Sequence, residues 1–430
     1  MTSVLRIGIA GLGTVGRGVV RLLAAHGDDL ARRCGRELAL VAVSARDRGR
    51  DRGIDLGGVR WHGDVGALAA DPEVDVVVEL IGGANGPALD LCRAAIAHGK
   101  PVVTANKAML AHHGTALAVA VEAAGVALGY EAAVAGGIPI VKALREGLAG
   151  NAVSRVFGIL NGTCNYILSA MTAQGRDFDE VLAEAQELGY AEADPGFDID
   201  GVDAAHKIAL LASLAFGRAV DFEAVHVEGI RDIGALDIGF AGELGFRVKL
   251  LGIATRTEEG IEQRVHPCLV SIAQPIAHVD GVFNAVVAEG DFVDRTMYVG
   301  RGAGAGPTAS AVVADLVDIA RGARLPVFGV PASELAARPS APMAHHRGAY
   351  YIRLMVVDRP GVMADVTAAL RDEEVSLEAL IQRGRNPGDG VPVVLTTHET
   401  GEAAMRRALE RIAALDAVLE RPRMIRIEAL

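Results

Sequence analysis

The chain of 430 residues is 51% hydrophobic and 22% charged, which is enough to form a large core in about three domains. Its net charge of −12 argues against a nucleic-acid partner, and no apolar stretch is long enough to cross a membrane. Cys34, Cys92, Cys164 and Cys268 include no Cys-x-x-Cys pair and the N-terminus has no signal-peptide pattern, so we expect a cytoplasmic protein with reduced thiols.

Strands and helices alternate over the first third of the chain. We predict strands at 4–10, 38–45, 74–80, 100–106 and 126–132, and helices at 17–26, 87–98 and 112–124. This alternation predicts an α/β domain with a doubly wound parallel sheet over residues 1–135. We expect a later helix, at about 307–321, to complete this domain.

The pattern changes at about residue 151. We predict a strand, then helices at 163–174, 178–188 and 200–216, and an antiparallel sheet from alternating apolar stretches at 246–272 and 282–299. These elements indicate a separate α+β domain over 136–325. A linker rich in Pro, Ala and His (326–348) then leads to a βαββαβ unit over 349–430, which is the ferredoxin-like arrangement.

A glycine-rich turn separates the first strand from the first helix. Its pattern G-x-G-x-x-G spans residues 11–16 and includes Gly11, Gly13, Thr14, Val15 and Gly16. The glycines allow a tight turn and the close approach of a pyrophosphate to a helix N-terminus. Because strand, turn and helix occur in the right order, the turn predicts a dinucleotide site rather than a packing feature alone.

The end of the second strand bears on the choice between NAD and NADP. An acid there would select NAD, whereas Arg46 could hold the 2′-phosphate of NADP, with Arg48, Arg50 and Arg52 adding positive charge. A solvated basic loop explains the same residues, so both interpretations stay open.

A polar turn follows the strand predicted at 100–106. It contains Thr104, Asn106 and Lys107, at the edge where open α/β sheets bind ligands. Lys107 could reach the nicotinamide side of a cofactor or the substrate. Thr104 or Asn106 could also cap the following helix, and the two roles are compatible.

The most polar stretch lies at 189–207. Five carboxylates fall within twelve residues: Glu192, Asp194, Asp198, Asp200 and Asp203. A helix then places Asp203 and Lys207 side by side, four residues apart, and its apolar neighbours indicate that it is partly buried. A lysine held by one acid near others suits proton transfer at an amino-acid substrate, whereas a surface ion pair is the plainer alternative.

Two further segments allow more than one interpretation. Cys164 could be the nucleophile of an acylating dehydrogenase, although most cysteines are inert small hydrophobes. Glu131 and the backbone carbonyls after it could hold a hard monovalent cation, or form a plain strand-to-helix connection.

Four segments together resemble homoserine dehydrogenase, in that family's order and over essentially the whole chain: IAGLGTVGRGV, TANK, GILNGTCNYIL and GYAEADPGFDIDGVDAAHK. The last two are specific to the family. The resemblance implies a Rossmann-type domain, a catalytic and dimerisation domain, and an enzyme that interconverts L-homoserine and L-aspartate 4-semialdehyde with NADP or NAD. That reaction belongs to threonine, isoleucine and methionine synthesis.

The resemblance also implies a role for each polar residue. The proton-transfer group is Lys207, with Asp203 as its partner and Lys107 as the second essential lysine. The substrate ammonium group is held by Glu192. The substrate site is lined by Tyr190, Asp198, Thr163 and Gly162. A monovalent cation such as Na⁺ is bound by Glu131 and the carbonyls of Val134, Gly136 and Ile138.

The C-terminal unit resembles an ACT domain whose ligand turn contains Asp358, Gly361, Val362 and Met363. The expected effector is L-threonine, and edge-to-edge pairing of ACT units predicts a homodimer or homotetramer. The alternatives are an acylating semialdehyde dehydrogenase that uses Cys164, and an amino-acid sensor without catalysis. A unit that only assists assembly is also compatible with the sequence.

Overall fold

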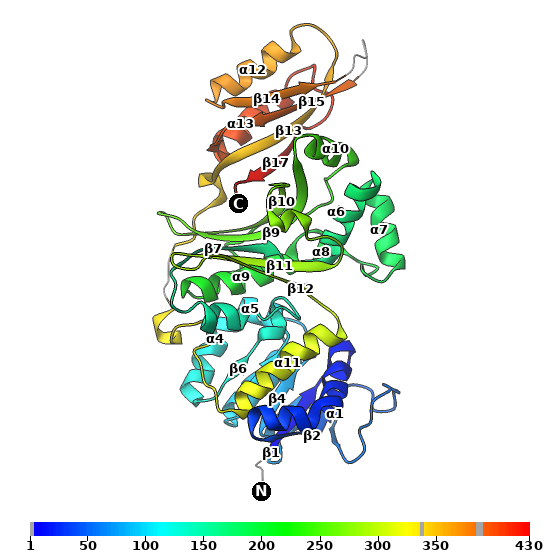
Figure 1. Ribbon diagram of the computed structural model, residues 1–430, viewed down its shortest axis with the longest axis vertical. Helices are drawn as coiled ribbons and strands as arrows, with labels where there is room; N and C mark the ends of the chain where they lie inside the picture. The colour runs from blue at the N-terminus through cyan, green and yellow to red at the C-terminus, as the bar shows by residue number, and fades with distance from the viewer. Residues whose placement is uncertain (1–3, 336–338, 384–389) are drawn as a thin grey trace.

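The computed structural model describes residues 4–335, 339–383 and 390–430, so residues 336–338 of the expected linker lie outside the described ranges. The molecule is elongated, with the N-terminal domain at one end, the C-terminal unit at the other and a broad sheet between them (Figure 1). Among the described residues, no helix is long and apolar enough to cross a bilayer.

The N-terminal domain is built on six parallel strands in the order β3-β2-β1-β4-β5-β6. The strands are β1 (Val4–Ala10), β2 (Glu37–Ser44), β3 (Arg60–His62), β4 (Val76–Glu79), β5 (Val102–Thr104) and β6 (Leu128–Gly129). Central side chains such as Ile7, Ile9 and Val77 are fully buried, because helices cover both faces of a parallel sheet. The strand order confirms the predicted doubly wound sheet, and it reverses between β1 and β4.

Five helices cover this sheet: α1 (Thr14–Cys34), α2 (Val65–Ala70), α3 (Pro87–Ala97), α4 (Lys107–Ala124) and α11 (Ala305–Ala320). Helix α11 comes from far along the chain and packs against α1, where Gly18 lies against Ala305 and Ala309 (Figure 1). Helix α1 is longer than predicted, and β3 and α2 were not predicted. Both are very short, which leaves little periodic pattern to detect.

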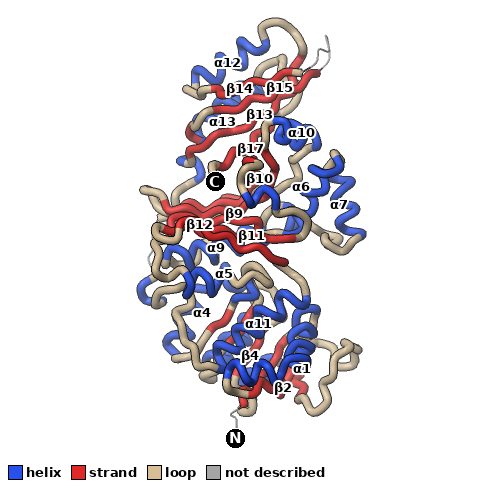
Figure 2. Tube along the Cα trace, in the orientation of Figure 1, coloured by secondary structure: helices blue, strands red, loops and turns tan. Residues whose placement is uncertain are grey.

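The middle of the chain forms a largely antiparallel sheet with helices beside it (Figure 2). Its strands are β7 (Val153–Ile159), β8 (His226–Val227), β9 (Phe246–Arg256), β10 (Ile261–Ser271), β11 (Phe283–Gly290) and β12 (Asp294–Arg301). Its helices are α6 (Gly162–Gln174), α7 (Phe178–Glu187), α8 (Gly196–Ile199), α9 (Val202–Phe216) and α10 (Ala235–Glu243).

Helix α9 is the most buried helix of this region. It lies against β7, β9 and β10 on one side and against α4 of the N-terminal domain on the other. The helix predicted at 200–216 is observed as α9, which begins at Val202 because Gly201, with a left-handed backbone (φ 86°), separates it from the short helix α8. Asp203 therefore lies in the first turn of α9, where a carboxylate is favoured.

Short elements connect these layers. They are the 3₁₀ turns η1 (Glu131–Ala133), η3 (Pro275–His278), η4 (Ala332–Glu334) and η5 (Met343–His345), the helix α5 (Ile140–Lys142) and the π-helical turn η2 (Ala143–Gly147).

The C-terminal unit confirms the predicted ferredoxin-like arrangement. Its elements are β13 (Arg347–Val357), α12 (Val362–Asp372), β14 (Leu377–Gln382), β15 (Gly390–Thr397), β16 (Thr400–Gly401), α13 (Glu402–Ala413) and β17 (Arg423–Glu428). The strand order β17-β13-β15-β14 is that of a split βαβ fold. Strand β14 is the outer edge of the sheet in this chain.

The C-terminal unit is not connected to the middle domain by the linker alone, because its strands extend the middle sheet. Strand β17 pairs in parallel with β10, residues 426–428 against 268–270. The sequence did not predict this pairing, because nothing in either strand's own pattern names its partner. A single sheet therefore connects the C-terminal unit to the strands on which α9 rests.

Buried ion pairs accompany this strand pairing. Arg426, from β17, donates to Glu228 at 2.8 and 3.0 Å and to Glu402 at 3.0 and 2.5 Å. Arg264, from β10, donates to both carboxylate oxygens of Glu428 at 3.0 and 2.9 Å. Removing one partner of a buried pair leaves an uncompensated charge, so these pairs favour the joined arrangement over a separated one.

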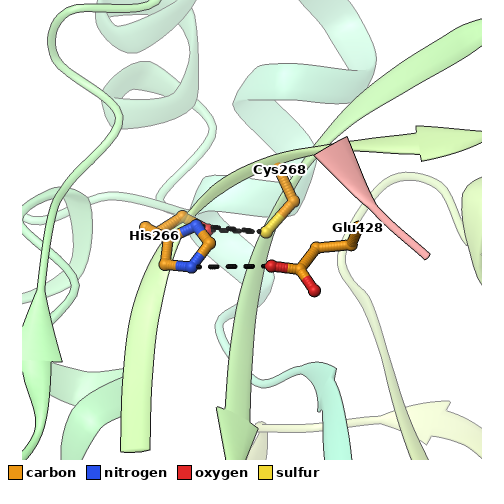
Figure 3. A group of neighbouring side chains, drawn as sticks. All are labelled: His266, Cys268 and Glu428. Atoms are coloured by element: carbon orange, nitrogen blue, oxygen red, sulfur yellow. Dashed lines mark hydrogen bonds and ion pairs between the residues drawn. The ribbon is translucent and has the colours of Figure 1, made fainter. Parts of the chain in front are cut away.

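His266, Cys268 and Glu428 approach one another at this junction (Figure 3). Their donor atoms are of the kinds that bind zinc. However, Arg264 already neutralises Glu428 and donates to His266 Nε2 at 3.1 Å. Burial, and then the nearby Arg426 and Arg264, hold the pKa of His266 well below its usual range, so the ring is neutral. We therefore interpret the cluster as a structural polar network.

We predict that Arg426→Met lowers the free energy of unfolding by about 3–5 kcal/mol, because Glu402 would be left buried without its guanidinium partner. Urea unfolding of the full chain measures the change. The matched control is Arg347→Ala, which removes an exposed ion pair with Glu399 and should cost about 1 kcal/mol or less.

The effect should depend on pH with a defined sign. Burial raises the pKa of Glu228 and Glu402, but hydrogen bonds, including those from Arg426, outweigh it and hold both below their ordinary value of 4.5. The pairs therefore stabilise the fold above pH 4.5 and lose this contribution as the pH falls. A difference between wild type and Arg426→Met that grows toward low pH would contradict this assignment.

Candidate active site

The glycine-rich turn occupies the carboxyl end of β1, where the strand order reverses. A Cβ atom at Gly11 would lie 2.3 Å from the carbonyl oxygen of Leu80, and one at Gly16 would lie 2.1 Å from that of Gly11. Only glycine fits at these two positions. Gly13, by contrast, faces open space at the N-terminus of α1, next to Thr14 and Val15. The helix N-terminus is thus open to an anionic group such as a pyrophosphate.

Arg46 lies two residues after the end of β2 and is exposed. No acid stands between the end of this strand and Arg46. Its neighbour Arg52 is engaged within the loop, donating to Arg50 and Asp47 and lying 5.4 Å from the ring centre of Trp61. Arg46 is the first of the four arginines after β2, and its contact with a 2′-phosphate stays a prediction.

Thr104 and Asn106 organise the neighbouring strand ends. Thr104 donates to Glu79 at 2.6 Å and accepts from the amide of Asn106 at 3.0 Å. The side chain of Asn106 caps α4 through the amide of Met109 and donates to the carbonyl of Gly83. The expected capping role is present, and the caps fix Lys107 as the first residue of α4.

Two lysines share one buried carboxylate at the centre of the site. Lys207 Nζ lies 2.6 Å from one oxygen of Asp203, and Lys107 Nζ lies 3.1 Å from the other. Lys207 also donates to the carbonyl of Leu160 at 2.7 Å. Burial alone would raise the pKa of Asp203, but the ammonium groups of Lys207 and Lys107 outweigh it and hold the pKa well below the usual range. Asp203 is thus a fixed negative charge.

A second carboxylate stands next to this group. Asp198, from α8, accepts from Asn161 at 2.8 Å and from Thr163 at 3.2 Å. Asn161 also donates to Asp203 at 2.8 Å, so it joins the two acids. Burial and the nearby charge of Asp203 raise the pKa of Asp198. A cationic substrate group would compensate this charge, and Gly162 and Thr163 begin α6 beside it.

Glu192 and Tyr190 lie on the loop between α7 and α8, and both are exposed. The carbonyl of Tyr190 accepts from Thr163 at 2.8 Å, which ties this loop to the site. Within the described ranges, no hydrogen bond or ion pair joins the Glu192 carboxylate to Asp203 or Lys207. The assigned role of Glu192 therefore stays a prediction.

Asn161 and the carbonyl of Leu160 are site groups to which the sequence did not assign roles. Both belong to the segment GILNGTCNYIL, whose Asn-Gly turn before a helix was the available signal.

Cys164 does not have the surroundings of a nucleophile. It is fully buried, and its thiol donates to the carbonyl of Asp198 at 3.2 Å. Burial, and then the charges of Asp198 and Asp203, raise the pKa of the thiol well above its usual range. These features argue against the acylating dehydrogenase that was considered from the sequence.

The turn after Glu131 is compatible with a cation but already partly engaged. The Glu131 oxygens accept from the amides of Val141 and Lys142 at 2.8 and 2.9 Å, and the carbonyl of Ile138 accepts from Ile140. Burial and the nearby Asp315 raise the pKa of Glu131 to about 7. Each oxygen retains a lone pair, and a cation would compensate the buried charge, so the turn fits a hard monovalent ion. The other expected ligands, Val134 and Gly136, lie in the same buried turn.

The expected ligand turn of the C-terminal unit connects β13 to α12. Gly361 caps α12 in a left-handed conformation (φ 96°), and a Cβ there would meet open space. Asp358 precedes it, whereas Val362 is buried and Met363 half-buried in the first turn of the helix. The exposed backbone at Gly361 leaves room for a ligand near the helix N-terminus.

Comparisons with known proteins agree with this arrangement. The family model described as "Homoserine dehydrogenase, NAD binding domain" matches residues 11–131, the one described as "Homoserine dehydrogenase" matches 139–317, and the one described as "ACT domain" matches 350–417. A homoserine dehydrogenase of Pseudomonas aeruginosa is 45% identical over 432 residues, covering 99% of each chain.

Two solved structures extend the comparison. The crystal structure of a homoserine dehydrogenase from Thiobacillus denitrificans has a TM-score of 0.94 and 47% identity, covering 100% of this chain and 99% of that one. A hyperthermophilic archaeal homoserine dehydrogenase in complex with NADPH has a TM-score of 0.62 and 26% identity, covering 73% of this chain and 97% of that one. The chain therefore belongs to the homoserine dehydrogenase family, and it is an oxidoreductase with an NAD-binding domain and an ACT domain.

Proposed function

We propose that this enzyme interconverts L-homoserine and L-aspartate 4-semialdehyde, with Lys207 as the group that moves the proton. The observation that carries the proposal is the pair of lysines on Asp203, located where α9 meets the N-terminus of α4. This point lies beside the carboxyl ends of the parallel strands, where dinucleotides bind. The product would enter threonine, isoleucine and methionine synthesis.

The bound nicotinamide cofactor supplies or accepts the hydride at the carbon being oxidised or reduced. Lys207 donates or accepts the proton of the oxygen attached to that carbon. Its ammonium group has three N–H donors, and two point at Asp203 and Leu160. The third N–H can reach a substrate oxygen, protonating the alkoxide that forms when the aldehyde is reduced. In the oxidative direction the neutral amine takes the hydroxyl proton.

The acidic groups around Lys207 suit the other end of the substrate. Asp198 is held by Asn161 and Thr163 so that its carboxylate borders the site. Together with Glu192, on the exposed loop between α7 and α8, it offers negative charge to the substrate ammonium group. Lys107 contacts the other oxygen of Asp203, where it can orient the carboxylate or the reacting oxygen.

We assign NADP as the preferred cofactor, with NAD accepted. Arg46 supports this assignment because it stands where an acid would repel the 2′-phosphate. The archaeal relative bound to NADPH is consistent with it. A monovalent cation such as Na⁺ is assigned to Glu131 with the carbonyls of Val134, Gly136 and Ile138, where it would hold the Glu131 carboxylate in its charged form.

The C-terminal unit is assigned a regulatory role with L-threonine as its effector. The exposed backbone at Gly361 and the continuous sheet between β17 and β10 support this role. Strand β14 has an outer edge in the single chain, which favours a homodimer or homotetramer through paired ACT units. The four cysteines are free and buried, which agrees with a cytoplasmic location.

We predict that Lys207→Ala lowers kcat by about 100-fold or more, because the reacting oxygen loses its acid–base partner. The dissociation constant of NADPH should change little. Steady-state rates and cofactor titrations measure both quantities. Cys164→Ser serves as the control and should retain activity. If Cys164→Ser lost as much activity as Lys207→Ala, the result would support the acylating mechanism with Cys164 as nucleophile.

We predict that Arg46→Ala weakens NADP binding by about 1–3 kcal/mol, the range for a charge-assisted hydrogen bond, with little change for NAD. Binding titrations with both cofactors test this. Arg48→Ala, an exposed neighbour in the same loop, is the matched control and should have a smaller effect. Equal losses for NADP and NAD would show that Arg46 does not select the cofactor.

We predict that millimolar L-threonine inhibits the intact enzyme and that Asp358→Asn remains active but is less sensitive. An effector must bind two states with different affinities, typically by about 1–3 kcal/mol. Calorimetry with threonine and initial rates give the two measurements. If the active enzyme binds no threonine, the C-terminal unit has only an assembly role.

A further inference from the structure

Asn284 is a buried amide whose hydrogen-bonding groups are unused. It lies near the start of β11 and is 1% exposed. Neither its Oδ1 nor its Nδ2 has a hydrogen-bond partner within the described ranges, and no other described side chain has two such atoms. Burying an amide without hydrogen-bond partners is unfavourable, so a group outside the protein chain is expected to satisfy it.

Two glycines make room for this side chain. A Cβ atom at Gly302 would lie 2.2 Å from Asn284 Cγ, so any other residue at position 302 would displace the amide. A Cβ atom at Gly162 would lie 3.5 Å from Asn284 Oδ1. Gly162 begins α6, next to Asn161, which donates to both Asp198 and Asp203. The amide therefore lies beside the residues that surround Lys207.

Gly302 connects the amide to the dinucleotide-binding domain. It lies between β12 and α11, the helix that packs on α1 (Figure 1). A Cβ atom at Gly136 would lie 2.4 Å from the Gly302 carbonyl oxygen, and the Gly137 amide donates to Arg301 at 3.0 Å. Asn284 is thus at the boundary between the two domains, with the substrate site on one side and the dinucleotide-binding domain on the other.

The proposed reaction indicates which chemical group would bind next to Asn284 at this boundary. Hydride transfer requires the nicotinamide ring to lie next to the substrate carbon, beside Lys207 and Lys107. The ring carries a carboxamide, which has the same paired donor and acceptor as the side chain of asparagine. Two carboxamides can therefore form a reciprocal pair of hydrogen bonds, which would satisfy both unused atoms of Asn284.

We propose that Asn284 is a cofactor-positioning residue that binds the carboxamide of the nicotinamide ring and thereby fixes the ring against the Lys207 site. This inference rests on the proposed use of a nicotinamide cofactor. It adds a contact at the reactive end of the dinucleotide, whereas the glycine-rich turn and Arg46 concern its phosphates. A buried water molecule is the competing occupant, and the experiment separates the two.

The test compares ligands that have or lack the nicotinamide end, using the full-length enzyme. Asn284→Leu keeps the size of the side chain but removes both hydrogen-bonding atoms. It should weaken NADPH binding by about tenfold or more and leave the affinity for 2′,5′-ADP, which has no nicotinamide, unchanged. Gln263→Leu is the matched control, since Gln263 is another buried amide with an unpartnered oxygen, on β10 near Asp221. It should bind both ligands as the wild type does.

A cofactor analogue gives an independent measurement on the wild-type enzyme. In the 3-acetylpyridine analogue of NADP⁺ a methyl group replaces the amide nitrogen, so one of the two hydrogen bonds is lost. The wild type should bind the analogue several-fold more weakly than NADP⁺, and Asn284→Leu should not distinguish them. The comparison of NADP⁺ with the analogue on the wild-type enzyme can be made even if the variant does not fold.

Two results would overturn the proposal. Unchanged NADPH affinity in folded Asn284→Leu would assign the amide to a buried water, and equal binding of NADP⁺ and the analogue by the wild type would exclude the carboxamide contact. A different result is expected if the proposed function itself is wrong. A chain that does not use this cofactor would bind neither NADPH nor 2′,5′-ADP.

Discussion

The site depends on one buried carboxylate held between two ammonium groups. Asp203 would be costly to bury alone, and Lys207 is equally costly to bury without it. Each therefore fixes the other, while Lys107 approaches from a different helix and domain. Two ammonium groups on one carboxylate carry a net positive charge, which in the proposed reaction would stabilise the negative charge that develops on the substrate oxygen. Its geometry is maintained by Asn161 and by the carbonyl of Leu160.

This arrangement explains why α9 is so buried. The helix holds Lys207 away from water and close to the start of α4, where Lys107 lies. It does so by packing on the middle sheet and on α4 at the same time. Because β17 extends that sheet, the C-terminal unit rests on the same strands that support α9. The ion pair between Arg426 and Glu228 adds a second connection, next to the segment in which the amide of Ile230 donates to Ile199 of α8.

Local pattern predicted most elements of the fold and the pairing of Asp203 with Lys207. The G-x-G-x-x-G turn follows from a short motif between a strand and a helix, and the approach of Asp203 to Lys207 follows from their helical spacing. The approach of Lys107 to Asp203 required the fold, as did the pairing of β17 with β10. Such contacts join residues far apart in the chain, and no local pattern specifies them. Asn284 was missed because a single asparagine in an apolar strand carries no sign that its amide will be left unpartnered.

The most direct test of this account is an assay of the purified full-length enzyme with L-homoserine and either NADP⁺ or NAD⁺, in which reduced cofactor and aldehyde are both quantified. The account predicts reduction that depends on homoserine, with one aldehyde formed for each cofactor reduced. An enzyme that binds the cofactor but forms neither reduced cofactor nor aldehyde, with any tested cation present, would contradict it.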